Sequence, residues 1–223
     1  ARPPGFESGY SVGVTGMRIA LDTRRRRHAD ELPPASDFVS PPGSGVRLAG
    51  RGELAGGLRD IDNTGPSDRH EWITWGGTLA GFVDLGESQR VLGLILIADF
   101  TEPLGDGEVP FTELVSLGGA RPLRGFLEGR LIDRSATALQ LDYQFPIWVW
   151  LDGTAHYAVG NVFGPALDGF EPERLRSSFG MGFRSAGSRD HLFEVLVAFG
   201  TERFESGAEI ESFRFVVGAT SAF

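Results

Sequence analysis

Apolar and polar residues alternate along most of this chain. The alternation is clearest in the C-terminal segment ESFRFVVGATSAF, where Phe213, Phe215 and Val217 share one face and Ser212 and Arg214 share the other. Successive side chains of a β-strand point to opposite faces of the sheet, so this two-residue period predicts a strand. The segments ATALQLDYQFPIWVWLDG, LRSSFGMGFRSAG and DHLFEVLVAFGTE repeat the pattern. We expect about nine strands in all, since no segment carries a helical stripe.

The connections between these segments are of two kinds. Short connections rich in Gly, Asp and Ser predict tight turns at 86–89, 151–153 and 187–190. Longer loops are expected at 57–71, 105–135, 164–175 and 203–211. Short turns at one end of the strands and long loops at the other are typical of a transmembrane β-barrel. The Pro- and Arg-rich stretch 24–45 is a long insert, which we interpret as a solvated juxtamembrane turn.

The two faces of the predicted strands differ in chemistry. One face is built from Phe, Val, Leu and Ile, whereas the other is rich in Gly, Ser and Thr with scattered charges. Lipid outside a barrel and water inside it favour this distribution. We therefore predict an all-β fold, an antiparallel transmembrane β-barrel to which residues 1–223 contribute about nine strands. The alternative is a soluble β-sandwich that acts as a binding module, with its apolar faces packed against each other.

Composition removes several classes of function. A net charge of −9 argues against nucleic acid as the main partner, and the lack of cysteine excludes disulfides and thiol chemistry. The histidines lie far apart and form no zinc-binding spacing, and neither a nucleophile elbow nor a phosphate-binding loop is present. We therefore expect a protein that is not an enzyme and that has no metal site and no cofactor.

One central stretch, LGGARPLRGFLEGR at 117–130, fits neither a helix nor an alternating strand. Together with the residues before it, this stretch resembles a motif of the outer-membrane barrel-assembly and polypeptide-translocation superfamily. That superfamily includes the BamA-type insertase, TamA-like proteins and two-partner-secretion relatives. The residues that match are Pro110, Phe111, Gly118, Gly119, Leu123, Arg124, Gly125 and Phe126. The segments LQLDYQFPI and AVGNVFG and the terminal Phe223 are also similar to the family, in the same order along the chain.

The resemblance implies a bacterial outer-membrane protein of a Gram-negative cell. Barrels of this family have sixteen strands preceded by periplasmic POTRA domains, so about nine strands imply the C-terminal half of such a barrel, or a small barrel. The implied partners are outer-membrane lipid, unfolded polypeptide clients, and an N-terminal barrel half, POTRA-like domains or a second copy. The implied function is insertion or translocation of polypeptides. The alternative is a barrel anchor or pore of a larger secreted or surface protein, such as a patatin-like fusion.

The resemblance also implies two functional elements. The loop 105–135 is expected to dip into the lumen as a lid, with Arg124 held by acidic residues of the inner wall. The strand faces offer Asp142 and Glu194 as partners, and Asp133 is a local alternative. Ala158 stands where the family often has an acidic residue.

The second element is the last strand. Its residues Phe213, Phe215 and Phe223 resemble the C-terminal signal of barrel proteins. Its edge is where client strands are expected to pair.

Overall fold

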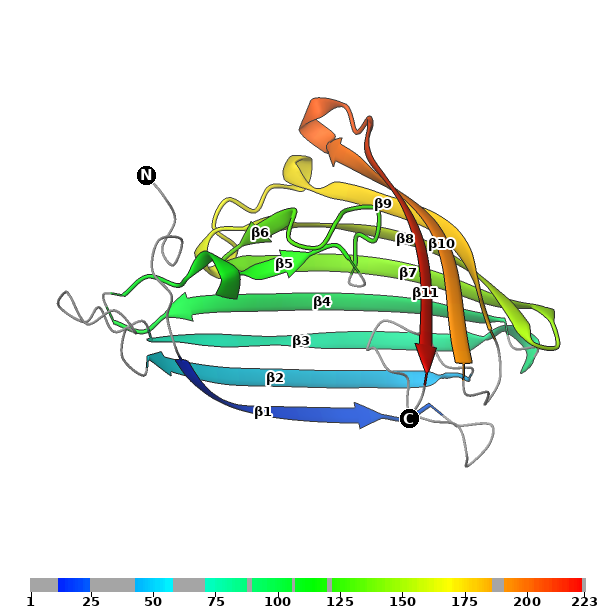
Figure 1. Ribbon diagram of the computed structural model, residues 1–223, viewed down its shortest axis with the longest axis horizontal. Coiled ribbons are helices and arrows are strands. Elements are labelled where there is room, and N and C mark those ends of the chain that lie inside the picture. The colour runs from blue at the N-terminus through cyan, green and yellow to red at the C-terminus, as the bar shows by residue number, and fades with distance from the viewer. Residues whose placement is uncertain are drawn as a thin grey trace.

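A computed structural model describes residues 12–24, 43–57, 71–87, 90–105, 107–119, 122–185 and 191–221. Its main element is one nine-stranded antiparallel sheet, in which each strand pairs with the next along the chain except where β4 pairs with β7 (Figure 1). The number of strands and their antiparallel order confirm the prediction. All nine of these strands belong to one continuous sheet, and the described residues do not divide them between two facing sheets as in a sandwich. The strands are β1 (Val12–Asp22), β2 (Gly45–Gly57), β3 (Glu71–Asp84), β4 (Val91–Pro103), β7 (Ser135–Trp148), β8 (Leu151–Phe163), β9 (Arg176–Ser185), β10 (His191–Arg203) and β11 (Ile210–Ser221).

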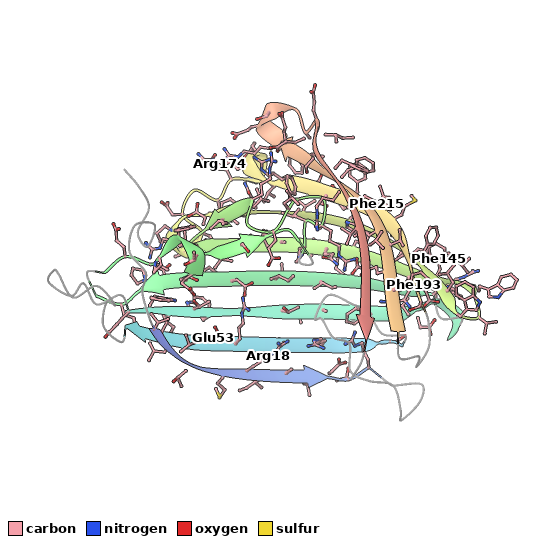
Figure 2. All side chains as sticks on the ribbon, viewed as in Figure 1. Arg18, Glu53, Phe145, Arg174, Phe193 and Phe215 are labelled. Atoms are coloured by element: carbon pink, nitrogen blue, oxygen red, sulfur yellow. The ribbon has the colours of Figure 1, made fainter. Side chains whose placement is uncertain are left out.

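Because apolar and polar residues alternate along each strand, the outer face of the sheet is apolar, as contact with lipid requires. On β4, Leu92, Leu94 and Leu96 are exposed, whereas Val91 and Ile95, which alternate with them, are buried. The same division continues on the later strands, where Figure 2 labels Phe193 of β10 and Phe215 of β11, both exposed. A continuous apolar surface of this extent is unusual for a water-soluble monomer and is the outer belt of a membrane barrel.

The sheet curves, and β9 to β11 fold over towards its inner side (Figure 1). A second, two-stranded sheet lies inside this curve and consists of β5 (Val115–Leu117) and β6 (Leu131–Asp133). This small hairpin belongs to the loop 105–135 and was not predicted, because strands of three residues are too short to show a period. It contacts β7 and β8, so the middle of the loop packs on the inner wall.

The turn between β7 and β8 differs from the prediction. It lies at Val149 and Trp150, whereas the predicted turn residues 151–153 begin β8. The reason is cross-strand pairing: Gly153 lies opposite Phe145, and the Phe145 ring covers it. The Nε2 group of Gln144 also donates to Asp152 Oδ2 at 2.8 Å. These contacts extend the ladder beyond the point where composition suggested a turn.

The predicted loops 164–175 and 203–211 are fully described, whereas several other predicted connections are described only in part or not at all. At 86–89, the 3-10 helix η1 (Leu85–Glu87) has Gly86 in the left-handed region, while 88–89 lie outside the described residues. The same holds for the turn 187–190 and for most of the insert 24–45, of which Arg24 bonds to Asp22. No helix within the described ranges is long and apolar enough to cross a membrane. The other short 3-10 helices are η2 (Phe111–Glu113), η3 (Pro165–Leu167), η4 (Pro172–Arg174) and η5 (Phe204–Ser206).

Candidate functional site

The segment from Val115 to Asp133, here called the lid loop, reverses direction sharply beside Arg124. Gly118 and Gly119 have φ values of 105° and 67°, which glycine adopts without steric cost. The Gly119 N–H donates to the Phe126 carbonyl oxygen at 2.9 Å and closes the reversal. Leu123 also has a positive φ, of 68°, which costs a non-glycine residue about 1–2 kcal/mol. Its side chain is fully buried, and that burial offsets the strain.

An apolar cluster fixes the lid loop to the wall. Leu117, Leu123 and Phe126 are almost completely buried. The wall beneath them is made of small side chains of β7 and β8, which leave room for the larger side chains of the loop. The whole cluster consists of Val115, Leu117, Leu123, Phe126, Leu131, Ala136, Ala138 and Ala158. Ala158, which removes an acidic group expected from the family, is thus part of the surface on which the lid loop packs.

Gly125 brings the loop backbone against the backbone of β10. A Cβ atom at this position would stand 2.2 Å from the carbonyl carbon of Phe199 and 2.4 Å from the amide nitrogen of Gly200. The Gly125 N–H donates to Ser178 Oγ of β9 at 2.8 Å, and its carbonyl oxygen accepts from Ser212 Oγ of β11 at 2.9 Å. Glycine is required here because any side chain would occupy the space of the wall.

Phe126 is seated beside Gly125 on the same part of the wall. Its ring covers Gly200, where a Cβ atom would stand 2.6 Å from the ring. The Arg176 guanidinium lies 5.7 Å from the centre of the same ring, within the range of a cation–π contact. The side chain therefore meets apolar surface on β7 and β8 and a cation from β9.

Arg124 points towards the charged residues of the inner wall. Its Nη1 lies 3.9 Å from Glu194 Oε1, with 9% of the Arg124 side chain and 44% of the Glu194 side chain exposed. Asp142 is buried on β7 within electrostatic reach of Arg124, and it accepts a hydrogen bond from Gln140 Nε2 at 2.6 Å. Asp133 accepts from the backbone N–H of Arg134 at 2.8 Å. Of the expected partners, Glu194 thus forms the described ion pair, and its long distance and exposure make that pair weak.

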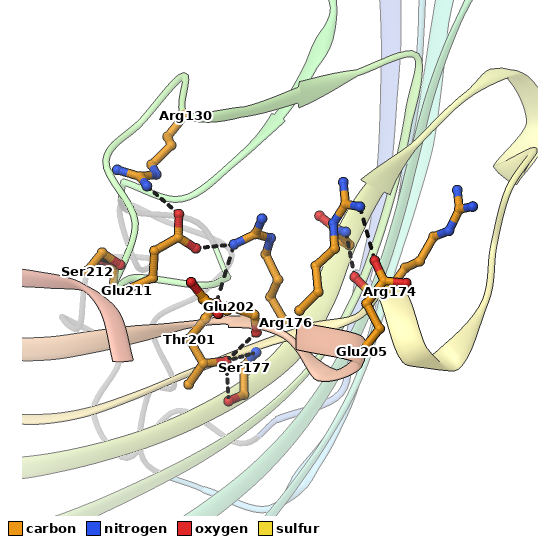
Figure 3. Close-up of polar contacts among 12 residues, drawn as sticks. Arg130, Arg174, Arg176, Ser177, Thr201, Glu202, Glu205, Glu211 and Ser212 are labelled. Atoms are coloured by element: carbon orange, nitrogen blue, oxygen red, sulfur yellow. Dashed lines mark hydrogen bonds and ion pairs between the residues drawn. The ribbon is translucent and has the colours of Figure 1, made fainter. Parts of the chain in front are cut away.

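The last strand supplies further contacts that sequence reasoning did not assign. Arg214 Nη1 donates to the carbonyl oxygens of Gly119 at 2.8 Å, Arg124 at 2.8 Å and Phe126 at 3.1 Å. At the end of the sheet that carries the long loops, Glu211 bonds to both Arg130 of the lid loop and Arg176 of β9 (Figure 3). The alternation in the sequence predicts Ser212 and Arg214 on the lumen face, and this was the one sequence feature that indicated contacts between them and the lid loop.

Comparison with known families matches residues 35–220 to the Omp85 superfamily domain. The chain belongs to the Omp85 superfamily. This confirms the resemblance inferred from the motif of the lid loop, and it places the protein in the bacterial outer membrane as a β-barrel protein.

A solved structure of the same fold is the crystal structure of BamA from Haemophilus ducreyi lacking POTRA domains 1–3. The TM-score is 0.57 at 18% sequence identity, and the match covers 92% of this chain and 42% of that one. The present chain thus spans less than half of the length of that relative. Comparison with curated proteins gave no match.

The C-terminal strand β11 carries two of the three residues of the expected barrel signal. Phe213 and Phe215 are exposed on the outer face of β11, about 60% in each case, as lipid-facing residues would be. Phe223, the third residue of the expected signal, lies outside the described residues. No group of three or more metal-ligating side chains occurs in the part of the chain that the structure describes.

Proposed function

We propose that this Omp85 superfamily chain inserts or translocates polypeptides at the outer membrane. In this proposal, β11 receives a strand of the client and the lid loop closes the lumen beside it. The observation that carries the proposal is the position of the lid loop: its polar contacts converge on β9, β10 and β11, at one edge of the described sheet. The role is non-enzymatic, as the family suggests.

The backbone chemistry of β11 supports this role. In the described sheet β11 pairs with β10 on one side and ends the strand order on the other. Backbone N–H and C=O groups cannot remain unpaired in lipid, so such an edge recruits another strand. Pairing through the main chain accepts clients of many sequences, because the side chains are not read. Gly218 lies within β11 with open space around it and weakens the strand locally.

The directions of the strands bear on how the barrel closes. With nine antiparallel strands in the described sheet, β1 and β11 run in the same direction. Direct closure of one copy, or a barrel shared by two copies, would therefore join parallel strands. Bacterial barrels close with antiparallel neighbours throughout, and this requires an odd number of additional strands. The geometry thus favours completion by an N-terminal barrel half, with POTRA-like domains as further proposed partners, over completion by a second copy.

Site-specific cross-linking tests the proposal directly. The chain has no cysteine, so Val217→Cys on β11 introduces a single thiol, and Leu94→Cys on the outer face of β4 is the matched control. A barrel client carrying one cysteine in its C-terminal strand is then supplied during insertion into lipid. A disulfide that forms at 217 and not at 94 is the expected result. Equal cross-linking at both positions would refute a role for β11.

The same reconstitution separates the alternative of an anchor or pore. An anchor holds a fused passenger and does not accelerate the insertion of unrelated barrels. Insertion of a separate client at the rate seen in protein-free vesicles, with efficient display of a fused passenger, would favour the anchor. Faster insertion of the separate client favours the proposed function.

A further inference from the structure

Three residues at the start of β11 contact the lid loop or its support. Glu211 bonds to Arg130, Ser212 Oγ donates to the Gly125 carbonyl oxygen, and Arg214 donates to three further carbonyl oxygens. The contacts to the lid loop are made by side chains, while the backbone of β11 pairs with β10 from Ser212 onwards, with a shift of register at Glu211. The strand at the sheet edge is therefore held from two directions, by β10 along its length and by the lid loop from inside.

Arg214 is the centre of this contact. One nitrogen carries two hydrogens and serves three carbonyl oxygens, so at least one hydrogen is shared between two acceptors. The acceptors belong to both arms of the reversal, since Gly119 precedes Arg124 and Phe126 follows it. The Gly119 N–H bonds to the same Phe126 oxygen, so the guanidinium group binds the reversal in its closed form. A charged donor makes such hydrogen bonds stronger than a neutral one would.

We propose that Arg214 is a positioning residue that latches the lid loop to the edge strand, so that the two move together. Displacement of β11 removes the guanidinium from the three carbonyl oxygens and frees the lid loop. Release of the lid loop in turn removes the inner support of β11. The coupling must be equal in both directions, because both effects measure one interaction free energy. This inference deepens the proposed function, since it gives an arriving client a way to open the lumen.

The first arm of the test follows the lid loop. Leu127, which is 62% exposed, is changed to cysteine and carries a nitroxide label in the full-length protein in lipid. Arg214→Gln is compared with Arg51→Gln, a matched change on β2 where the arginine pairs with Asp99 at 3.1 Å. We expect the mobile fraction of the label to rise about tenfold in Arg214→Gln, from the loss of charged hydrogen bonds, and to stay unchanged in Arg51→Gln. Equal label mobility in the two variants would overturn the latch.

The second arm follows β11. Phe126→Leu weakens the seat of the lid loop on the wall without touching β11 itself, and hydrogen exchange is measured on the β11 amides that bond to β10. Exchange there should become about tenfold faster, while exchange in β3 stays the same. A mobile lid loop with unchanged exchange in β11 would show that Arg214 only holds the loop, and would reject the coupling.

Arg214→Lys keeps these arms interpretable if Arg214→Gln does not fold. A lysine ammonium retains a charge and three donors but lacks the planar fork of arginine. The label in Arg214→Lys should therefore be more mobile than in wild type and Arg51→Gln, and less mobile than in Phe126→Leu. Mobility in Arg214→Lys equal to or above that in Phe126→Leu would contradict the latch. Neither arm uses a client. If these arms show the latch but the protein does not insert clients, only the proposed function is rejected. If the protein inserts clients but these arms show no latch, only the present inference is rejected.

Discussion

Gly125 of the lid loop touches the backbone of Phe199 on β10 so closely that a Cβ atom would stand 2.2 Å from the Phe199 carbonyl oxygen. The loop and the wall therefore meet backbone to backbone, and β10 cannot retreat without breaking its pairing with β9 and β11. A side chain at position 125 has to push the lid loop away from the wall.

Gly125→Ala should loosen the lid loop by about 1–3 kcal/mol, the usual cost of adding atoms to a filled site. The ratio of mobile to immobile nitroxide at Leu127→Cys measures this change. Gly56→Ala on β2 is the control, because a Cβ atom there would meet nothing within 4 Å. An immobile label in Gly125→Ala would mean that the loop and β10 are farther apart than the structure has them.

Ala158→Leu should also displace the lid loop, by a different contact. Ala158 is fully buried in the cluster that includes Phe126, and extra methyl groups would enter the space of the loop side chains. A cost of about 1–3 kcal/mol is expected, read as label mobility at position 127. Ala155→Leu on the outer face of β8 serves as the comparison and should leave the label immobile. Similar spectra for the two variants would argue against packing of the loop on this wall.

The ion pair between Arg124 and Glu194 should contribute little by itself. The separation of 3.9 Å and the 44% exposure of Glu194 indicate a screened interaction. A double-mutant cycle with Arg124→Gln and Glu194→Gln should give a coupling free energy below about 1 kcal/mol, measured as docking of the lid loop. A second cycle with Asp142→Asn distinguishes the two acidic residues. A coupling of several kcal/mol to Glu194 would contradict the geometry.

Charge on the outer face should be costly in proportion to depth in the membrane. Leu96→Arg lies near the middle of β4 and should reduce the free energy of unfolding in lipid by about 2–4 kcal/mol. Leu92→Arg lies near the turn end of the same strand and should cost about 0–1 kcal/mol. Denaturant titration of the protein in vesicles measures both. Equal costs would mean that this face does not span the bilayer as described.

The sequence predicted the strands because lipid and water impose opposite demands on their two faces. Leu139 and Leu141 point outwards and Gln140 and Asp142 inwards, as the two-residue period requires. The sequence did not locate the turn at Val149 and Trp150. Glycine usually ends a strand, but Gly153 continues β8 because the ring of Phe145 covers it.

The lid loop was found through its resemblance to the family and not through any period. Nothing local marked Arg214 as the residue that holds it, because the chain contains 21 arginines and no lysine, and the acceptors are backbone oxygens. Contacts of a side chain with a distant main chain depend on how the sheet curves. A strand pattern carries no information about that curvature.

Because the described sheet has nine strands, the chain enters β1 and leaves β11 on opposite sides of the membrane. Val12 starts β1 at the end that carries the long loops, and Ser221 closes β11 at the end that carries the short turns. In outer-membrane barrels the first end faces the cell surface and the second faces the periplasm. A passenger joined directly ahead of β1 would therefore be displayed outside the cell. A periplasmic domain on the same polypeptide would need an odd number of membrane crossings before Val12.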